Sequence, residues 1–403
     1  MQETTKQGFS DLGISPEFLG ILEKNNFITP TPIQRQAIKP AMEGKDVVGI
    51  AQTGTGKTLA FGLPLLQRLR GTGQIGLVIL PTRELAIQAD EMLQKIGRSL
   101  GLVTAVIIGG ESMGKQIMSL HRRPNILIGT PGRIMDHIER GNLKLDRVAA
   151  VVLDEADRML DIGFGPQIKR IFNFIPVQRQ VMLFSATMPA EIVRIAATYM
   201  SSPVRIEVAP SGTTAELVDQ EIFLVRKEDR IPLLVKILEE NPGPVLLFMR
   251  TRHGARKVCA VLREMGYKAA EIHSDRSLVQ RKAALAGFKA NQYRILVATD
   301  IAARGIDVHG IKLVINFELP DNTHDYVHRI GRTGRAGDVG RAISFAMPDQ
   351  GRDVRDIEKL IRKELPIKHH GEQTFLTNVS SFRSSVSGQP KHHSPRRHRV
   401  YRR

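Results

Sequence analysis

Ala51-Gln52-Thr53-Gly54-Thr55-Gly56-Lys57-Thr58 follows directly on the apolar run Val47 to Ile50 and precedes a helical pattern. Its glycines let consecutive backbone amides turn inward on the β-phosphate of a nucleoside triphosphate. Lys57 then neutralises charge on the β- and γ-phosphates, and the Thr58 hydroxyl ligates magnesium. A strand before this phosphate loop and a helix after it are the context that the loop requires. The stretch therefore predicts an α/β fold with a nucleotide bound at a strand end.

Asp154 and Glu155 end a second apolar run, Val148 to Leu153. A carboxylate at the carboxyl end of a buried parallel strand points into the crevice where ligands bind. We expect Asp154 to hold the magnesium ion and Glu155 to orient and deprotonate the attacking water. An acidic pair after a strand, taken alone, favours a solvated turn or a helix cap. Together with the phosphate loop it predicts an ATPase.

Short apolar runs alternate with longer helical patterns along most of the chain, which is typical of a mostly parallel sheet flanked by helices. One helix is predicted between Arg83 and Leu100, with Gly101 as its C-terminal cap. The predicted strands are Val47–Ile50, Ile75–Leu80, Val103–Ile108, Ile126–Ile128, Val148–Leu153, Val181–Phe184, Val245–Met249, Ala269–Ile272, Ile295–Ala298, Leu313–Phe317 and Ala342–Phe345.

The chain of 403 residues is too long for one ordinary core, so two globular domains are expected. The small, polar stretch 208–215 breaks the pattern, and the same alternation then restarts without a short sequence repeat. We predict an N-terminal nucleotide-binding domain at 1–208, a linker at 209–216, a second α/β domain at 217–365 and a flexible tail at 366–403.

Charge favours a polyanionic partner, because 58 Lys and Arg face 41 Asp and Glu, a net charge of +17. No apolar run approaches the roughly 20 residues that span a bilayer. The start MQETTKQGFSDLG has no basic-then-apolar signal pattern, so a cytoplasmic location is expected. The tail 366–403 carries eight Lys or Arg and one acid, a net +7, and its composition predicts disorder.

Cys259 is the only cysteine, which excludes an internal disulfide and a cysteine-based zinc site. Its neighbours Ala255, Val258, Leu262 and Met265 recur at helical spacing, so we expect all five residues to share one buried helix face. Histidine pairs in the tail have no acidic or cysteine partners at ligand spacing, and a solvated basic tail explains them better than a metal site.

The combined motifs resemble those of the DEAD-box RNA helicases, named for the tetrapeptide Asp154-Glu-Ala-Asp157. The resemblance covers residues from about 9 to 345 in the family's motif order. It implies two tandem RecA-like domains, with ATP and Mg²⁺ as cofactors and RNA as partner. Phe27 and Thr-Pro-Thr-Pro-Ile-Gln34 look like the Q motif, in which Gln34 reads the adenine edge and Phe27 stacks on it. The implied nucleotide-binding set is Phe27, Gln34, Ala51, Gln52, Thr53, Gly54, Thr55, Gly56, Lys57, Thr58 and Asp307.

The resemblance also assigns catalytic, coupling and RNA-binding roles. Arg332 and Arg335 would act as arginine fingers on the γ-phosphate, because phosphoryl transfer needs positive charge where negative charge accumulates. With Lys57, Asp154 and Glu155 they complete the implied catalytic set. Coupling between nucleotide and RNA is implied for Asp157, Ser185, Thr187 and His328. The implied RNA contacts, to phosphates and sugars, are Pro81, Thr82, Arg83, Gly109, Gly110, Thr130, Arg133, Arg281 and Thr299.

Two positions depart from the family pattern. Leu278 stands where the family has a glutamine three residues before an arginine, here Arg281. This change puts in doubt the interdomain or RNA contact that the glutamine makes. Ser274 replaces the glycine of His-Gly-Asp, a mild change in a loop. Neither change is expected to abolish ATP hydrolysis.

The resemblance implies RNA-stimulated ATP hydrolysis coupled to domain closure and local duplex unwinding or remodelling of RNA–protein complexes. Two other classes stay open: an ATP-gated RNA clamp with little unwinding, and a DNA-directed helicase of the wider superfamily. The short flanks and basic tail are similar to those of bacterial members. A monomer is expected, with ribosomal or ribonucleoprotein components open as further partners. The tail is open between an RNA anchor and an inert solubilising segment.

Overall fold

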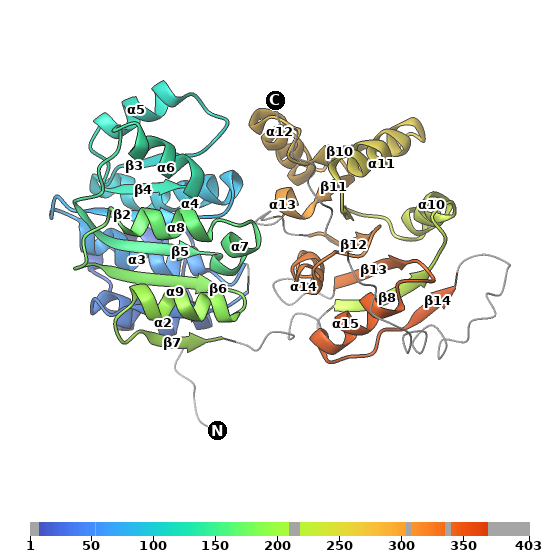
Figure 1. The fold of residues 1–403 in the computed structure, drawn as a ribbon, viewed down its shortest axis with the longest axis horizontal. Coiled ribbons are helices and arrows are strands. Elements are labelled where there is room, and N and C mark those ends of the chain that lie inside the picture. The colour runs from blue at the N-terminus through green and yellow to red at the C-terminus, as the bar shows by residue number, and fades with distance from the viewer. Residues whose placement is uncertain are drawn as a thin grey trace, which may run out of the picture.

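The computed structural model describes residues 8–52, 54–208, 218–303, 308, 310–334 and 340–369. Two separate sheets are built in turn along the chain, one before residue 208 and one from residue 218 onward. Figure 1 shows them as two α/β lobes that lie next to each other, the first coloured blue to green and the second yellow to red.

The first sheet has seven strands in the order β3-β4-β2-β5-β6-β1-β7, and every neighbouring pair is parallel. Successive residues of a strand point to opposite faces, so Val47 joins one apolar cluster and Val48 the other. The strands are β1 Val47–Ile50, β2 Ile75–Ile79, β3 Thr104–Ile107, β4 Ile126–Gly129, β5 Val148–Asp154, β6 Gln180–Ser185 and β7 Val204–Glu207.

Helices cover both faces of this sheet, as its buried, Val- and Ile-rich strands require. One face packs against α1 to α4, and the other against α6 to α9. The helices are η1 Phe9–Leu12, α1 Pro16–Lys24, α2 Pro32–Met42, α3 Lys57–Leu69, α4 Arg83–Gly97, η2 Arg98–Leu100, α5 Met113–His121, α6 Pro131–Glu139, α7 Ala156–Asp161, α8 Gly165–Phe172 and α9 Ala190–Tyr199.

The second sheet repeats the first strand for strand, in the parallel order β10-β11-β9-β12-β13-β8-β14. Its strands are β8 Val218–Leu224, β9 Val245–Met249, β10 Ala269–Ile272, β11 Ile295–Thr299, β12 Leu313–Asn316, β13 Gly340–Ala346 and β14 Ile367–His369. Its helices are α10 Arg230–Glu240, α11 Arg252–Glu264, α12 Leu278–Lys289, α13 Asp300–Ala303, α14 Thr323–Ile330 and α15 Gly351–Ile361. The repeated architecture without a sequence repeat is thereby confirmed.

Every strand predicted from the sequence is present, with ends shifted by at most two residues. The predicted helix is α4 followed by η2, and Gly101 caps η2 with a φ of 76°. Three strands were missed: β7, β8 and β14. The predicted tail starts too early, because Ile367–His369 pairs with β8 and belongs to the second sheet. The tail from 370 and the linker 209–216 lie outside the described residues.

The prediction for the Cys259 face is wrong in one member. Ala255, Val258, Cys259 and Leu262 are buried as expected, whereas Met265 is 51% exposed. Met265 follows the last residue of α11 as its C-cap, so its side chain no longer lies on the inward face. Burial raises the pKa of the Cys259 thiol to about 11, as expected for a cysteine that serves as a core residue.

Candidate active site at the junction of the two lobes

The predicted nucleotide residues gather at the carboxyl ends of three adjacent strands of the first sheet, β5, β6 and β1. The phosphate loop follows β1, Asp154 ends β5, and Ser185 ends β6. Ala51 N donates to Ser185 O at 3.0 Å and so ties the loop to the neighbouring strand β6. A crevice at this edge is where open α/β sheets bind ligands.

The phosphate loop turns through left-handed backbone at Gly54 and Gly56, with φ of 87° and 90°. Lys57 starts α3 and is 5% exposed; its Nζ donates to Ala51 O at 3.1 Å and lies 3.9 Å from Asp154 Oδ1. The Nε2 of Gln52 is buried without a hydrogen-bond partner among the described residues. The amides at the start of α3, Lys57 and this spare donor suit a phosphate group. Thr53 lies outside the described residues.

Gln34 connects the N-terminus of α2 to the phosphate loop. Its Oε1 accepts from Thr31 N at 2.9 Å, and its Nε2 donates to Gly56 O at 3.0 Å. Thr31 Oγ1 donates to Thr55 O at 2.7 Å, so a second bond holds the same loop. Phe27 packs against the first apolar cluster, with Lys95 Nζ 5.4 Å from the centre of its ring. The Q-motif residues therefore lie directly beside the loop.

Asp154 and Glu155 are both buried but titrate in opposite directions. Burial is the main cause that raises the pKa of Asp154 to about 6, and the nearby Lys57 offsets only part of it. Burial also acts to raise the pKa of Glu155, yet Arg158, Lys57, Arg332 and His328 outweigh it and lower that pKa to about 2. Glu155 is therefore ionised at neutral pH.

Two features single out Glu155. Its φ of 52° is in the left-handed region, which costs a non-glycine residue about 1–2 kcal/mol and is often found at functional sites. Arg158 Nη1 lies 3.3 Å from Glu155 Oε2. Arg332 and His328 come from the second lobe, so cations of both lobes act on this one carboxylate. Arg335 and Asp307 lie outside the described residues.

The donors present fit a magnesium ion. The buried Asp154 carboxylate has Lys57 as its cation at 3.9 Å, too far for a hydrogen bond, and a hydroxyl at Thr58 follows the loop. Mg²⁺ prefers such oxygen ligands and usually takes only one or two from the protein, the rest from phosphates and water. Among the described residues no group of three or more His, Cys, Asp or Glu could form an all-protein metal cage. A nucleotide-bound metal is the kind that this site can hold.

The coupling residues of the first lobe form one hydrogen-bonded cluster. Thr187 donates to Asp157 Oδ2 through both its N, at 2.9 Å, and its Oγ1, at 2.8 Å. Asp157 N donates to Ser185 Oγ at 3.1 Å. A cavity of about 490 Å³ next to this cluster is lined by Asp157 and Thr187 from the first lobe and by His328 from the second. The cluster thus lies at the junction of the lobes.

The predicted RNA residues of the first lobe lie beside the nucleotide site, after strands β3, β4 and β2. Arg83 rests on two glycines: a Cβ built on Gly110 would lie 2.1 Å from Arg83 Nη1, and one on Gly109 would lie 3.1 Å from Nη2. Burial, and then Arg281, lowers the pKa of Arg83. The Nε of Arg133 is buried without a hydrogen-bond partner among the described residues. Pro81, Thr82 and Thr130 lie on the same edge, where Thr82 caps α4 and Thr130 precedes α6.

The second lobe adds Arg281 and Thr299 to this surface. Arg281 Nη1 lies 2.8 Å from Glu84 Oε1 across the junction, and both side chains are less than a tenth exposed. Thr299 ends β11. Arg83, Arg133 and Arg281 therefore form a cationic cluster that both lobes build, in which Glu84 pairs with Arg281 and Asp136 with Arg133.

Sequence reasoning missed three functional neighbours. Arg158 lies three residues after Glu155, a helical spacing that predicts an ion pair. Glu84 has no local signal, because its partner Arg281 is far away in the sequence. Arg329 lies three residues before Arg332; it is 1% exposed and holds Asp300 at 2.5 and 2.7 Å, so it fixes the end of β11.

Comparisons with known proteins agree with this geometry. Family models described as DEAD/DEAH box helicase and helicase conserved C-terminal domain match residues 31–195 and 229–337. The chain is 42% identical over 378 residues to the ATP-dependent RNA helicase CshA of Limosilactobacillus reuteri, covering 93% of this chain and 76% of that one. For the DEAD-box ATP-dependent RNA helicase CshA of Geobacillus kaustophilus the identity is 41%, covering 89% and 77%.

Solved structures share the fold of both lobes. Dbp5 of S. cerevisiae bound to RNA and ADP BeF3 gives a TM-score of 0.80 at 29% identity, covering 90% of this chain and 95% of that one. Mss116p bound to ssRNA and AMP-PNP gives 0.84 at 25% identity, covering 96% and 84%. Within the described ranges, every helix is too short or too polar to cross a membrane.

Proposed function

The chain belongs to the DEAD-box family of ATP-dependent RNA helicases, with their two tandem RecA-like domains. We propose a role for each of its site residues in ATP hydrolysis and RNA binding. The chain is an ATP-hydrolysing enzyme that acts on RNA. One observation carries these assignments: Glu155 of the first domain lies in the field of Arg332 and His328 of the second. Hydrolysis then requires the two domains to be closed on each other.

In the proposed nucleotide site, the first domain binds ATP and the second domain completes the catalytic set. The phosphate loop and Lys57 hold the phosphates, and Gln34 and Phe27 hold the adenine. Asp154 and Thr58 would hold Mg²⁺, which supplies charge neutralisation on the phosphates. Glu155 orients the attacking water. Arg158, Lys57 and the second domain lower its pKa, so it is ionised and can accept a hydrogen bond, and then the proton, from that water.

Arg332 supplies positive charge to the transferring phosphoryl group, with Arg335 as its partner finger. Asp307 contacts the ribose. Because these arginine fingers come from the second domain, ATP turnover depends on domain closure. When the domains separate, the fingers leave the site. Coupling is assigned to a set of residues near the cleft between the domains, whose contacts change when the nucleotide is hydrolysed. The set is Asp157, Ser185, Thr187 and His328.

RNA is proposed to lie on the cationic cluster of Arg83, Arg133 and Arg281. The supporting residues are Pro81, Thr82, Gly109, Gly110, Thr130 and Thr299. These groups suit phosphates and 2′-hydroxyls rather than base edges, so little sequence preference is expected. Both domains contribute to the cluster, and RNA therefore favours closure. Closure that bends one strand separates a short duplex locally.

We assign residues 1–208 to the ATP-binding domain and 217–369 to the second domain, because β14 completes its sheet, with 209–216 as the linker. A cytoplasmic monomer is proposed, with ribosomal or ribonucleoprotein components as further partners. An ATP-gated RNA clamp is the second candidate function. The presence of Glu155 together with Arg332 and Arg335 favours turnover over a static clamp.

The test compares ATP hydrolysis with and without single-stranded RNA in the wild type and in Arg332→Gln. Loss of an arginine finger is expected to lower RNA-stimulated turnover by about 10³-fold or more, while ATP still binds. Arg352→Gln is the control, since Arg352 is three-quarters exposed on α15 of the same domain. Equal hydrolysis with and without RNA in the wild type would overturn the coupling. Normal stimulation in Arg332→Gln would remove Arg332 from its role.

A further inference from the structure

Leu278, the residue that departs from the family pattern, is buried at the junction of the two domains. It is 6% exposed and belongs to an apolar cluster whose other members, from Phe9 to Ile206, all come from the first domain. It is also the first residue of α12, a helix of the second domain. A side chain of one domain therefore completes the core surface of the other.

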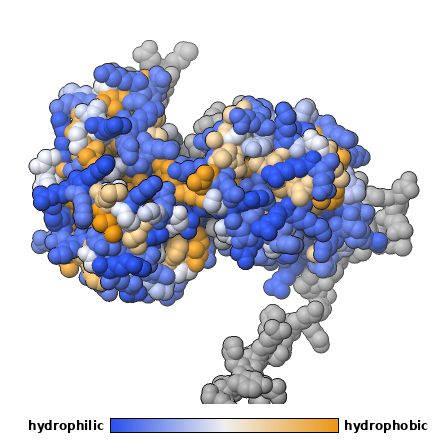
Figure 2. Space-filling model, turned by 90° about the horizontal axis from the view of Figure 1, so that it is seen from above, coloured by the Kyte–Doolittle hydropathy of each residue, from blue (hydrophilic) through white to orange (hydrophobic). Residues whose placement is uncertain are grey.

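The surroundings of Leu278 form a seam between α4 and α12. Arg281, one helical turn further on, makes the ion pair with Glu84 across the same seam. A groove of about 260 Å³ continues along it. Its apolar lining includes Ile87 of α4 and Leu278 and Leu285 of α12, and its charged or polar lining is Glu84, Gln88, Glu91, Arg281, Lys282 and Lys289. Figure 2 shows apolar side chains gathered where the two lobes meet. Leu278 and Arg281 thus present one apolar and one charged contact to the same helix.

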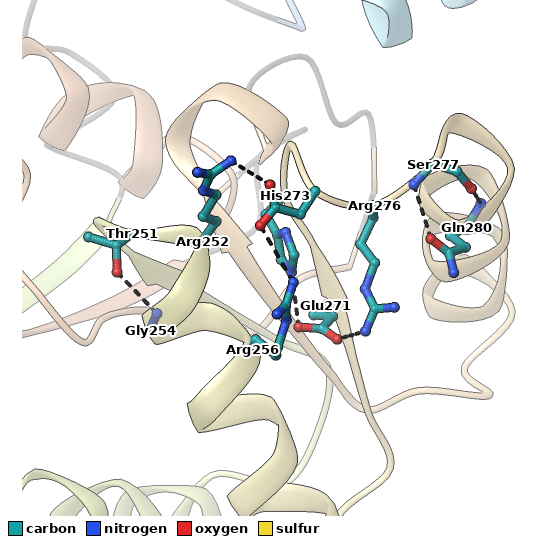
Figure 3. Close-up of polar contacts among 10 residues, drawn as sticks. Thr251, Arg252, Gly254, Arg256, Glu271, His273, Arg276, Ser277 and Gln280 are labelled. Atoms are coloured by element: carbon teal, nitrogen blue, oxygen red, sulfur yellow. Dashed lines mark hydrogen bonds and ion pairs between the residues drawn. The ribbon is translucent and has the colours of Figure 1, made fainter. Parts of the chain in front are cut away.

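Neighbouring residues of α12 do not restore the missing amide. Gln280 is the glutamine nearest to Leu278 in the sequence, but its Oε1 accepts from Ser277 N at 3.0 Å and its N donates to Ser277 Oγ at 3.2 Å, as a capping box. Figure 3 shows this box at the start of α12. Val279 is 77% exposed and points away from the seam. The first turn of α12 therefore offers α4 an apolar group at position 278.

We propose that Leu278 is a positioning residue that stabilises the closed arrangement of the domains through apolar burial against the first domain. A buried leucine gains its stabilisation from leaving water, so this contribution needs neither the γ-phosphate nor RNA. It raises the closed fraction of the free protein, and the apparent affinity for RNA rises with that fraction. The inference rests on the proposed function only for its link to RNA affinity.

The size of the effect follows from the burial. A leucine side chain that is exposed when the domains separate and buried when they close favours closure by roughly tenfold or more. Glutamine at the same position keeps part of the apolar contact but places an amide in the seam. We therefore expect Leu278→Gln to lower the closed fraction about tenfold and to raise the RNA concentration for half-maximal ATPase by a similar factor.

The experiment measures the distance between the domains by single-molecule energy transfer in the full chain. Dyes are attached at Val103→Cys and Met265→Cys, which are exposed positions of the first and second domains. Cys259 is buried, and burial raises the pKa of its thiol, so it stays unlabelled. Leu278→Gln and Leu278→Met are compared with the wild type and with Val279→Gln, which adds the same amide one residue away on the exposed side.

The expected result is a lower closed fraction without ligands in Leu278→Gln, near-normal closure in Leu278→Met and no change in Val279→Gln. The melting temperature of Leu278→Gln should stay close to wild type, because the side chain is not in the core of its own domain. The salt dependence of RNA binding should keep its slope, since no phosphate contact is lost.

Two results would overturn the proposal. One is an unchanged closed fraction in Leu278→Gln. The other is a loss of RNA affinity with an altered salt slope and unchanged closure, which would make position 278 an RNA contact. A wild type without RNA-stimulated ATPase would instead contradict the proposed function, while the closed fractions would still decide whether Leu278 holds the domains together.

Discussion

Gly110→Ala is the sharpest test of where RNA binds. Gly110 has a φ of 77°, and a Cβ there would lie 2.1 Å from Arg83 Nη1 and 2.8 Å from its Cζ. Real Cβ atoms do not approach that closely, so the Arg83 guanidinium must leave its place on the glycine pair. The substitution therefore moves a proposed phosphate ligand without removing its charge from the protein.

The magnitude has two parts that can be separated. The left-handed backbone costs alanine about 1–2 kcal/mol, a loss of stability that any such glycine would show. One lost phosphate contact makes the plot of log affinity against log salt shallower by about 0.7 and weakens RNA binding about fourfold at roughly 0.15 M salt. Gly101→Ala is the matched control, because its φ is 76° and a Cβ there meets nothing within 4 Å.

The assay is fluorescence anisotropy of a labelled single-stranded RNA with an ATP analogue, repeated over a range of salt, with thermal melts of each variant. Both variants should melt at similarly reduced temperatures, and only Gly110→Ala should lose affinity and slope. Equal RNA affinity and equal slopes in the two variants would refute the assignment of Arg83 to a phosphate.

Three further outcomes follow from single contacts. Glu155→Gln should still bind ATP and RNA but stop turnover, and normal turnover would exclude Glu155 from the reaction. Thr187→Val removes the 2.8 Å bond to Asp157, worth about 1.5–3 kcal/mol, so unwinding should fall more than ATPase; equal losses would argue against coupling. Burial, then Arg133, lowers the pKa of His137, so the folded state resists protonation and stability falls below about pH 6.5. His137→Gln should flatten that fall in thermal melts, and an unchanged fall would place its source elsewhere.

The strands and the nucleotide site could be predicted because their signals are local. Phosphate-loop glycines, an apolar run and a carboxylate at its end lie within a few residues of one another, and a parallel sheet converts that order into a shared edge. The β14 strand could not be found in this way. It has only three residues, and its identity depends on the open edge of β8 rather than on its own pattern.

Contacts between the domains could not be predicted from the sequence either. Arg281 was predicted as an RNA contact, but nothing in the sequence links it to Glu84, and only the closed arrangement brings the two to 2.8 Å. Leu278 was recognised as a departure from the family, but its burial depends on a surface that the first domain supplies. Met265 fits the helical spacing in the sequence, but it was predicted wrongly because α11 ends one residue before it.

The short strand β14 determines how the chain can be shortened. Ile222 N donates to Pro366 O, and Lys368 Nζ lies 2.5 Å from Glu221, so these residues cover the outer edge of β8. A chain that ends at residue 365 would leave the backbone of β8 open to pairing with another molecule, which is a common route to aggregation. A chain that ends at residue 369 would keep that edge closed. A loss of solubility on truncation at residue 365 would then be due to the uncovered sheet edge. Only truncation at residue 369 would measure the contribution of the basic segment.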